Sequence, residues 1–331
     1  MPDELDSRIE RWDRTALTGT PYADLLRLVE YLHDKRYYQY LPTVGPFPGF
    51  FERLSQWIAQ VDSPLMQKAL LNLVPYILFV GQEEFALLYR AAFRGPITRW
   101  LCSVANVDLE SPDASQLIST ELLEHTWYCP ITDSMNINAF HHVNRIERVQ
   151  ARPDWASLAR FGNKDKIHEF MQKKGLSRLV LLEDFVGTGT QMRKAVEFAA
   201  TQLPDVPILL CPLIVADKGN SVGNSLPSKY SNLLFKPVFT LRSHHGAFIS
   251  PHHKDQRAQW HRILRIVGNL SARLADRIFP QGFPPDWGPW GYKDSGTIVV
   301  MYSNTPNNSV PMLHVDGGDH WTALFPRSKR V

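Results

Sequence analysis

One continuous stretch, residues 179–191, constrains the fold of this chain more than any other. It reads Leu-Val-Leu-Leu-Glu-Asp-Phe-Val-Gly-Thr-Gly-Thr-Gln. The unbroken apolar start is typical of a parallel strand covered on both faces. Side chains of adjacent strand residues point to opposite sides, so at least one of Glu183 and Asp184 should face inward or line a crevice. We therefore predict a central parallel strand over residues 178–184, with a ligand site beyond its end.

The residues that follow suit a phosphate. Gly187 and Gly189 let backbone amides approach a ligand closely, and Thr188 and Thr190 add hydroxyl donors. A helix that begins near Thr190 would add a partly positive N-terminus. A buried strand with an ordinary tight turn is the structural alternative.

Two other phosphate-binding loops do not match the residues. A P-loop ends in Gly-Lys-Ser/Thr, whereas Gly189 is followed by Thr190. The dinucleotide fingerprint needs a third glycine, and Met192 stands there. Neither loop is predicted.

The segment resembles the PRPP-binding motif of type I phosphoribosyltransferases, which has an apolar strand, two acids, two apolar residues and a Thr/Ser/Gly loop. The resemblance implies that Glu183 and Asp184 contact ribose hydroxyls and act in catalysis. It also implies that residues 187–191 hold the 5′-phosphate. Gln191 departs from the family pattern, which has Ser or Thr there, and this departure favours a binding role over base transfer.

Composition is that of an ordinary globular protein. The chain has 331 residues, 44% hydrophobic and 21% charged, with a net charge of +3 that is too small to indicate nucleic-acid binding by itself. Its three cysteines show neither disulfide nor zinc-ligand spacing, which favours a reducing cytoplasm. We expect no signal peptide and no membrane span.

Residue patterns predict a helical region over residues 1–100 and an α/β domain over residues 101–331. The segment Asp62-Ser63-Pro64 is a helix start ahead of residues 66–80. Pro212 lies in a buried apolar run and indicates a sheet edge or a bend. Further strands are predicted over 127–131, 208–215, 232–241 and 297–302, a loop over 217–230, and a helix over 256–278.

Ser134 follows the first α/β strand. Ser134 or Asp133 could cap the helix that runs to Val143. Alternatively, Ser134 and Asn136 could hold a pyrophosphate at the strand-to-helix turn. Both interpretations stay open.

A second polar loop follows the last predicted strand and contains Asn304, Thr305, Asn307 and Asn308. It is either a rigid turn, since Asn bonds its own backbone, or a ligand contact. Loops after parallel strands emerge at one sheet edge. We therefore predict that this loop lies beside the phosphate loop and helps to shape one pocket.

Four histidines lie within residues 244–253. Imidazoles can bind zinc, but no cysteine or acid completes an established spacing. We assign no metal ligand, and a flexible or substrate-covering loop is the preferred interpretation.

The resemblance becomes more specific when the helical start, the acidic pair and the Asn-Thr-Pro-Asn-Asn loop before Trp321 are taken together. The chain is similar to phosphoribosyltransferase-like proteins of prokaryotic conflict systems, including retron-associated and other antiphage operons. That similarity implies an antiviral effector or regulatory component with protein partners from the operon. Nucleic acid would be involved only indirectly.

The sequence thus predicts an α/β, type I phosphoribosyltransferase-like parallel sheet flanked by helices, with an N-terminal helical region. Its ligand would be a ribose phosphate or nucleotide, accompanied by Mg²⁺, which binds through few protein carboxylates plus substrate phosphates. An enzyme would cleave or transfer at C1′. The alternatives are a nucleotide-sensing or partner-docking module with a degenerate pocket, and a scaffold.

Overall fold

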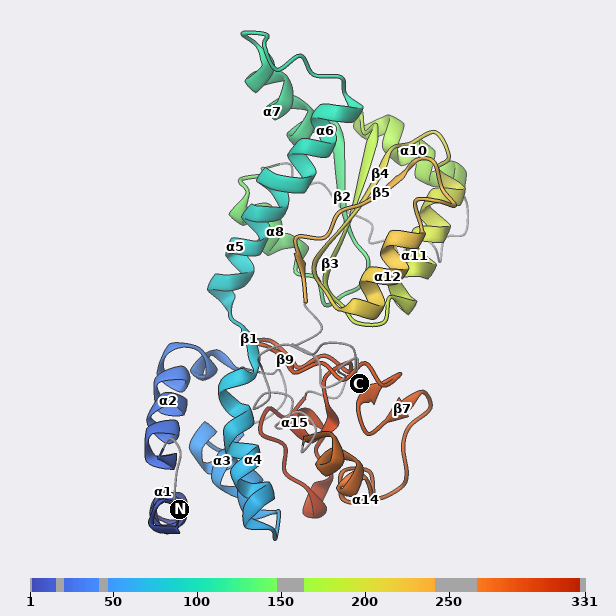
Figure 1. Cartoon of the computed structure of the whole chain (residues 1–331). Coiled ribbons are helices and arrows are strands. Elements are labelled where there is room, and N and C mark those ends of the chain that lie inside the picture. The colour runs from blue at the N-terminus through green and yellow to red at the C-terminus, as the bar shows by residue number, and fades with distance from the viewer. Residues whose placement is uncertain (1, 16–20, 42–46, 148–163, 242–266, 328–331) are drawn as a thin grey trace, which may run out of the picture. The chain divides into compact units, whose positions relative to one another are not determined.

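The computed structural model describes residues 2–15, 21–41, 47–147, 164–241 and 267–327. The chain forms two compact units (Figure 1). The terminal unit combines Met1–Gln82 with Arg242–Val331, and the central unit is Glu83–Leu241. The domain boundary expected near residue 100 stays a prediction.

A five-stranded parallel sheet forms the middle of the central unit (Figure 1). Its strands are β2 (Thr126–Pro130), β3 (Arg178–Val186), β4 (Ile208–Val215), β5 (Leu233–Phe235) and β6 (Phe239–Thr240). The order is β2-β3-β4-β5, and β6 pairs with β4 beyond β5. The four strands predicted for this region are confirmed, the last as two short pieces. The predicted α/β fold class is confirmed as well.

Helices cover both faces of this sheet (Figure 1). They are α5 (Gln82–Ala92), the π-helix η3 (Phe93–Ile97), α6 (Thr98–Val104), α7 (Ala114–Glu124), α8 (Ile137–Val143), α10 (Lys164–Lys174), α11 (Thr190–Gln202) and α12 (Asp217–Ser225). Leu181 packs in one core cluster with Met171 of α10 and Val196 of α11. On the other face, the Tyr128 ring lies 5.4 Å from the Phe140 ring of α8. Two covered faces explain the unbroken apolar run of β3.

Pro212 affects the strand beside it. β4 is an interior strand, paired with β3 on one side and with β5 and β6 on the other, so the expectation of a sheet edge at Pro212 is wrong. The Pro212 carbonyl accepts from the Val238 amide at 2.9 Å, but proline has no amide hydrogen to return to that neighbour. The edge strand is accordingly interrupted between β5 and β6.

The loop predicted over residues 217–230 is wrong, because α12 occupies residues 217–225. Two glycines one helical turn apart explain the close packing of this polar helix. A Cβ on Gly219 would lie 2.7 Å from the Val186 side chain, and a Cβ on Gly223 would lie 2.4 Å from the Phe235 ring. The two glycines thus let α12 pack closely against the sheet. The same glycines had contributed to the prediction of a loop for this segment.

The terminal unit is mainly helical, which confirms the predicted N-terminal helical region. Its helices are α1 (Pro2–Thr15), α2 (Tyr22–Lys35), η1 (Tyr37–Gln39), α3 (Phe50–Ala59), α4 (Pro64–Leu73), η2 (Val74–Tyr76), α14 (Ala275–Ile278), α15 (Pro311–His314) and η5 (Gly318–His320). Its strands are β1 (Leu78–Val80), β7 (Trp287–Gly288), β8 (Gly291–Tyr292) and β9 (Val299–Met301). Pro64 opens α4 as predicted, but the helix expected to reach residue 80 ends at Leu73. Residues 267–273 are also helical, and the earlier part of the helix predicted over 256–278 lies outside the described residues.

The two segments of the terminal unit close one core. β1 from the first segment pairs in parallel with β9 from the second. The Trp57 indole donates to the Met312 carbonyl at 2.9 Å, and the buried Arg53 donates through Nε to the Leu324 carbonyl at 2.8 Å. Each of these contacts joins residues more than 200 positions apart in the chain, so both segments are needed for this core.

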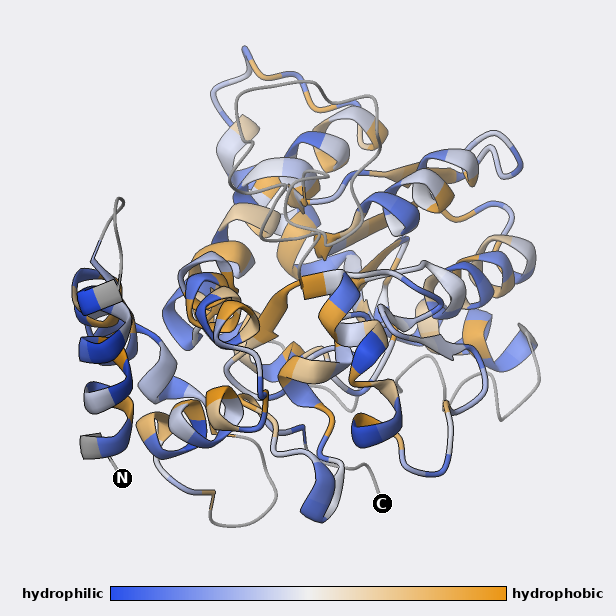
Figure 2. Cartoon of the chain, turned by 60° about the horizontal axis from the view of Figure 1, so that its bottom comes forward, coloured by the Kyte–Doolittle hydropathy of each residue, from blue (hydrophilic) through white to orange (hydrophobic). Residues whose placement is uncertain are grey.

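Hydropathy follows the same organisation. In Figure 2 the strands of the sheet are largely apolar, whereas the helices carry apolar and polar stripes. Such stripes are typical of helices that bury one side. Within the described residues, no helix combines the length and the apolar character that crossing a membrane requires.

We expect Gly223→Ala to destabilise the protein by about 1–3 kcal/mol, because the added methyl group overpacks the contact between α12 and the Phe235 ring. Asn224→Ala, at the next and exposed position of the same helix, is the matched control and should be neutral or slightly stabilising. Chemical denaturation of both variants measures the difference. Equal stabilities would contradict the close packing at Gly223.

Candidate ligand site at the end of β3

The acidic pair lies near the C-terminal end of β3. Glu183 and Asp184 are each 5% exposed, and the strand continues through Phe185 to Val186. The predicted central strand followed by a loop and a helix is confirmed. Burying two neighbouring carboxyl groups is costly unless both receive hydrogen bonds, so their partners define the site.

Those partners come from the loop between β2 and α8. The Thr132 amide donates to Glu183 Oε2 at 3.0 Å, and the Thr132 hydroxyl donates to Glu183 Oε1 at 2.6 Å. The Ser134 hydroxyl donates to Asp184 Oδ1 at 3.0 Å. The two hydroxyl oxygens lie 2.7 Å apart. A continuous chain of polar contacts therefore links the two acids through Thr132 and Ser134.

Strand register explains this meeting. Pro130, the last residue of β2, is in register with Leu182, and the Ile131 amide donates to the Leu182 carbonyl at 2.8 Å. The residues just beyond β2 therefore run beside Glu183 and Asp184. Asn136 is the cap of α8, since its Oδ1 accepts from the Ala139 amide at 3.0 Å. The expected cap at Asp133 or Ser134 is wrong, and the Ser134 hydroxyl bonds Asp184 instead.

Burial raises the pKa of Glu183 well above its ordinary value, and the neighbouring Asp184 carboxylate adds to that increase. The hydrogen bonds from Thr132 act in the opposite direction.

The predicted phosphate loop turns directly into α11. Gly189 has a φ of +77° and precedes Thr190, the first residue of the helix, so the left-handed conformation there requires glycine. The Gly187 carbonyl accepts from the Gly219 amide at 2.8 Å, which ties the loop to the start of α12. The Thr188 and Thr190 hydroxyls lie 3.2 Å apart. The loop is thus fixed between two helix starts.

Gln191 is exposed in the first turn of α11. A helix start of this length presents amide donors and a partly positive end to solvent. Buried carboxyl groups on a strand, followed at once by a glycine-threonine loop and a helix, form an arrangement that can bind a sugar hydroxyl and a phosphate in one ligand.

A family model described as PRTase-CE matches residues 54–327. The chain belongs to the PRTase-CE family. It is therefore a phosphoribosyltransferase-like protein, as the acidic pair and its loop indicated. No curated protein and no solved structure matches the chain. The matched region of this PRTase-CE protein includes the acidic pair, the phosphate loop and the loop after β9.

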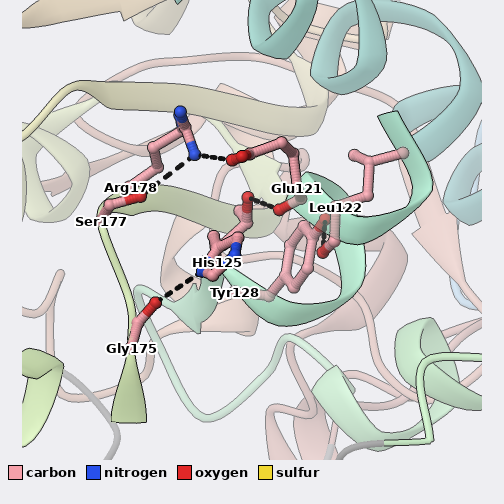
Figure 3. A network of polar contacts seen from close by, with 8 residues as sticks. Glu121, Leu122, His125, Tyr128, Gly175, Ser177 and Arg178 are labelled. Atoms are coloured by element: carbon pink, nitrogen blue, oxygen red, sulfur yellow. Dashed lines mark hydrogen bonds and ion pairs between the residues drawn. The ribbon is translucent and has the colours of Figure 1, made fainter. Parts of the chain in front are cut away.

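The opposite end of the PRTase-CE sheet is held by a second polar network (Figure 3). Arg178, the first residue of β3, pairs with Glu121 of α7, and its Nη1 also donates to the Ser177 hydroxyl at 3.0 Å. His125 Nδ1 lies 2.8 Å from the Gly175 carbonyl oxygen. These contacts join α7, the start of β3 and the residue before β2 at the end of the sheet opposite the acidic pair.

The loop after β9 lies in the terminal unit. β9 pairs with β1, so the premise that both polar loops leave one sheet is wrong. Thr305 is fully buried, with its hydroxyl 3.2 Å from the Tyr40 hydroxyl. Asn308 Nδ2 donates to the Ser295 hydroxyl at 2.8 Å, Asn307 Oδ1 accepts from Arg327, and Asn304 Oδ1 accepts from the Thr305 amide. These contacts stabilise a turn, while the proximity of this loop to the phosphate loop, and its role in binding, stay predictions.

The described residues contain no group of three or more His, Cys, Asp or Glu side chains arranged to hold an ion. The histidines of residues 244–253 lie outside the part of the chain that is described. Both Glu183 oxygens accept hydrogen bonds from Thr132. A Mg²⁺ ion would therefore depend on oxygens that a phosphorylated ligand supplies, since Mg²⁺ is commonly bound together with substrate phosphates.

Sequence reasoning missed Thr132. Its position directly after a strand was visible, and hydroxyl residues at such ends often bind polar groups. The missing information was that β2 is the neighbour of β3, which makes Thr132 the partner of Glu183.

We expect Glu183→Gln to stabilise the protein at neutral pH and to flatten the dependence of its stability on pH above about 4.5. A buried acid with a raised pKa binds its proton more tightly in the folded state, so wild-type stability falls as pH rises from about 4.5 through the folded pKa. The loss is about 1.4 kcal/mol per unit of pKa difference. Glutamine carries no titrating proton, and its side-chain oxygen can still accept a hydrogen bond from the Thr132 amide.

Melting temperatures across this pH range measure the effect. Glu169→Gln, at an exposed position of α10, is the control and should leave the pH profile unchanged. Parallel profiles for wild type and Glu183→Gln would contradict a protonated carboxyl group in the acidic pair.

Proposed function

We propose that this PRTase-CE protein binds a ribose phosphate or nucleotide at the end of β3. The observation that carries the proposal is the buried Glu183–Asp184 pair on a central parallel strand, followed directly by the Gly187–Thr190 loop and the start of α11. The acids would accept hydrogen bonds from ribose hydroxyls. The loop amides and hydroxyls, with the helix N-terminus, would hold the phosphate.

Membership of a phosphoribosyltransferase-like family supports this assignment of the loop and the acids. The family match and the local geometry are separate observations, since the first concerns the sequence over residues 54–327 and the second concerns the placement of a few side chains. Both favour a sugar phosphate over other anions. Two buried carboxyl groups can accept hydrogen bonds from sugar hydroxyls, but they do not help to bind a simple anion.

As an enzyme, the protein would cleave or transfer at C1′ of the ribose. Such a reaction develops positive charge at the sugar, and nearby carboxylates stabilise charge of that sign. Glu183 and Asp184 are the groups assigned to that role. Mg²⁺ bound with the ligand phosphates would neutralise part of the phosphate charge.

A second function, nucleotide sensing without turnover, is favoured by one specific position. Gln191 stands where the motif carries Ser or Thr, and it is exposed on the first turn of α11. In this alternative the same pocket binds a nucleotide, and the helical terminal unit docks a protein partner. Consumption of nucleotide or PRPP by the purified protein distinguishes the two functions.

In the cell, we assign the protein to antiviral defence as an effector or regulatory component, with protein partners from the same operon. Support comes from the resemblance of its motif and its terminal Asn-rich loop to proteins of prokaryotic conflict systems. A phage-protection assay tests this assignment. Equal plating efficiency with and without the protein and its operon neighbours, over a broad panel of phages, would contradict it.

We expect Asp184→Asn and Glu183→Gln each to weaken ligand binding by about 10–150-fold while the fold is retained. Each change replaces an acceptor oxygen of the acidic pair by an amide nitrogen that cannot accept, and the hydrogen bond that is lost contributes about 1.5–3 kcal/mol. Titration calorimetry with PRPP, ribose 5-phosphate and nucleotides, with and without Mg²⁺, measures the loss. Asp205→Asn, at an exposed position ahead of β4, is the matched control. Wild-type affinity in both site variants would make the acidic pair purely structural.

A further inference from the structure

The carboxyl groups of Glu183 and Asp184 already accept hydrogen bonds from other residues of the protein. Glu183 accepts hydrogen bonds at both carboxylate oxygens from Thr132, and Asp184 accepts at Oδ1 from Ser134 and from the Phe185 amide. At 5% exposure, neither acid presents much surface to a ligand. A ligand that uses these carboxylates must therefore replace donors that are present in this structure.

The donors from the loop have a recognisable pattern. Two hydroxyl oxygens 2.7 Å apart lie on two adjacent carboxyl groups, one hydroxyl on each. Two hydroxyls on neighbouring carbons of a ribose present the same arrangement of donors. The Thr132 and Ser134 hydroxyls thus stand where the diol of a ribose would be bound.

The two hydroxyls lie on a short part of the loop between two buried anchors. Ile131 and Met135 are buried at 7% and 3% exposure and anchor it at both ends. Between these anchors, Thr132 and Ser134 are partly exposed and Asp133 is exposed. The Asn136 cap fixes the start of α8 independently of the loop hydroxyls. A change limited to residues 132–134 can expose the acids without unfolding β2 or α8.

We propose that the loop between β2 and α8 is an internal substitute for the ligand's diol, and that a ribose phosphate binds by displacing the Thr132 and Ser134 hydroxyls from the acidic pair. This inference rests on the proposed function, since it concerns the same site. It makes the closed loop an autoinhibitory contact that selects for vicinal hydroxyls. A sugar phosphate without the diol cannot supply both replacement donors.

A positioning role for the same residues predicts the opposite result. If Thr132 and Ser134 stay bonded and orient the acids for the ligand, then removing their hydroxyls weakens binding. If they compete with the ligand, removing them strengthens binding. The sign of the change separates the two roles.

The experiment compares wild type, the double variant Thr132→Val/Ser134→Ala, and the conservative control Thr132→Ser by titration calorimetry with ribose 5-phosphate. We expect the double variant to bind about 5–30-fold more tightly than wild type, from the loss of two competing hydrogen bonds. Thr132→Ser keeps the hydroxyl and should bind like wild type. Unchanged or weaker binding by a folded double variant would overturn the inference.

Hydrogen exchange of the wild-type protein gives a second readout that needs no substitution. Because the Thr132 amide donates to Glu183, saturating ribose 5-phosphate should speed amide exchange in residues 131–134, and 2-deoxyribose 5-phosphate should do so far less. Slower exchange with ribose 5-phosphate would overturn the inference even if the double variant fails to fold. If wild type, control and double variant all bind none of ribose 5-phosphate, PRPP and nucleotides, the proposed function is refuted, and the inference with it.

Discussion

The hydrogen bonds between the β2–α8 loop and the acidic pair on β3 make the rest of the site possible. Two adjacent carboxyl groups in the interior of a sheet would be strongly destabilising without donors. Thr132 and Ser134 supply those donors from the neighbouring strand end. The parallel pairing of β2 with β3 places these donors beside the two acids. The donors that the two buried acids need are therefore available only because β2 is the neighbour of β3 in the sheet.

Much of this arrangement could be predicted from the chain alone. The strand, the loop and the start of α11 follow from an apolar run, two acids and two glycines, which are all local signals. Thr132 was missed because its importance depends on which strand neighbours β3 and in which register, and a single sequence does not contain that pairing. The same limit applies to β9, whose partner β1 is a three-residue strand inside a segment with helical spacing.

The error at α12 has a different cause. Residues 217–225 are polar and contain two glycines, a composition that favours loops. In the structure those glycines lie where any side chain would meet Val186 or Phe235. Propensity was overridden by packing, because the helix gains its stability from close contact with β3 and β5 and from the bond between the Gly219 amide and the Gly187 carbonyl. The segment that was predicted as a loop is thus a helix, and it supports the phosphate loop.

The divided terminal unit has a consequence for how the chain is made. Trp57 and Phe79 emerge from the ribosome long before Met312 and Phe325, with which they share one core, and the entire central unit is synthesised in between. During that interval the N-terminal helices carry an apolar surface that has no permanent cover. Such long-range closure is slow, because the ends of a long loop must meet before their contacts contribute. We therefore expect the nascent protein to expose apolar surface until the second segment of the terminal unit has been synthesised.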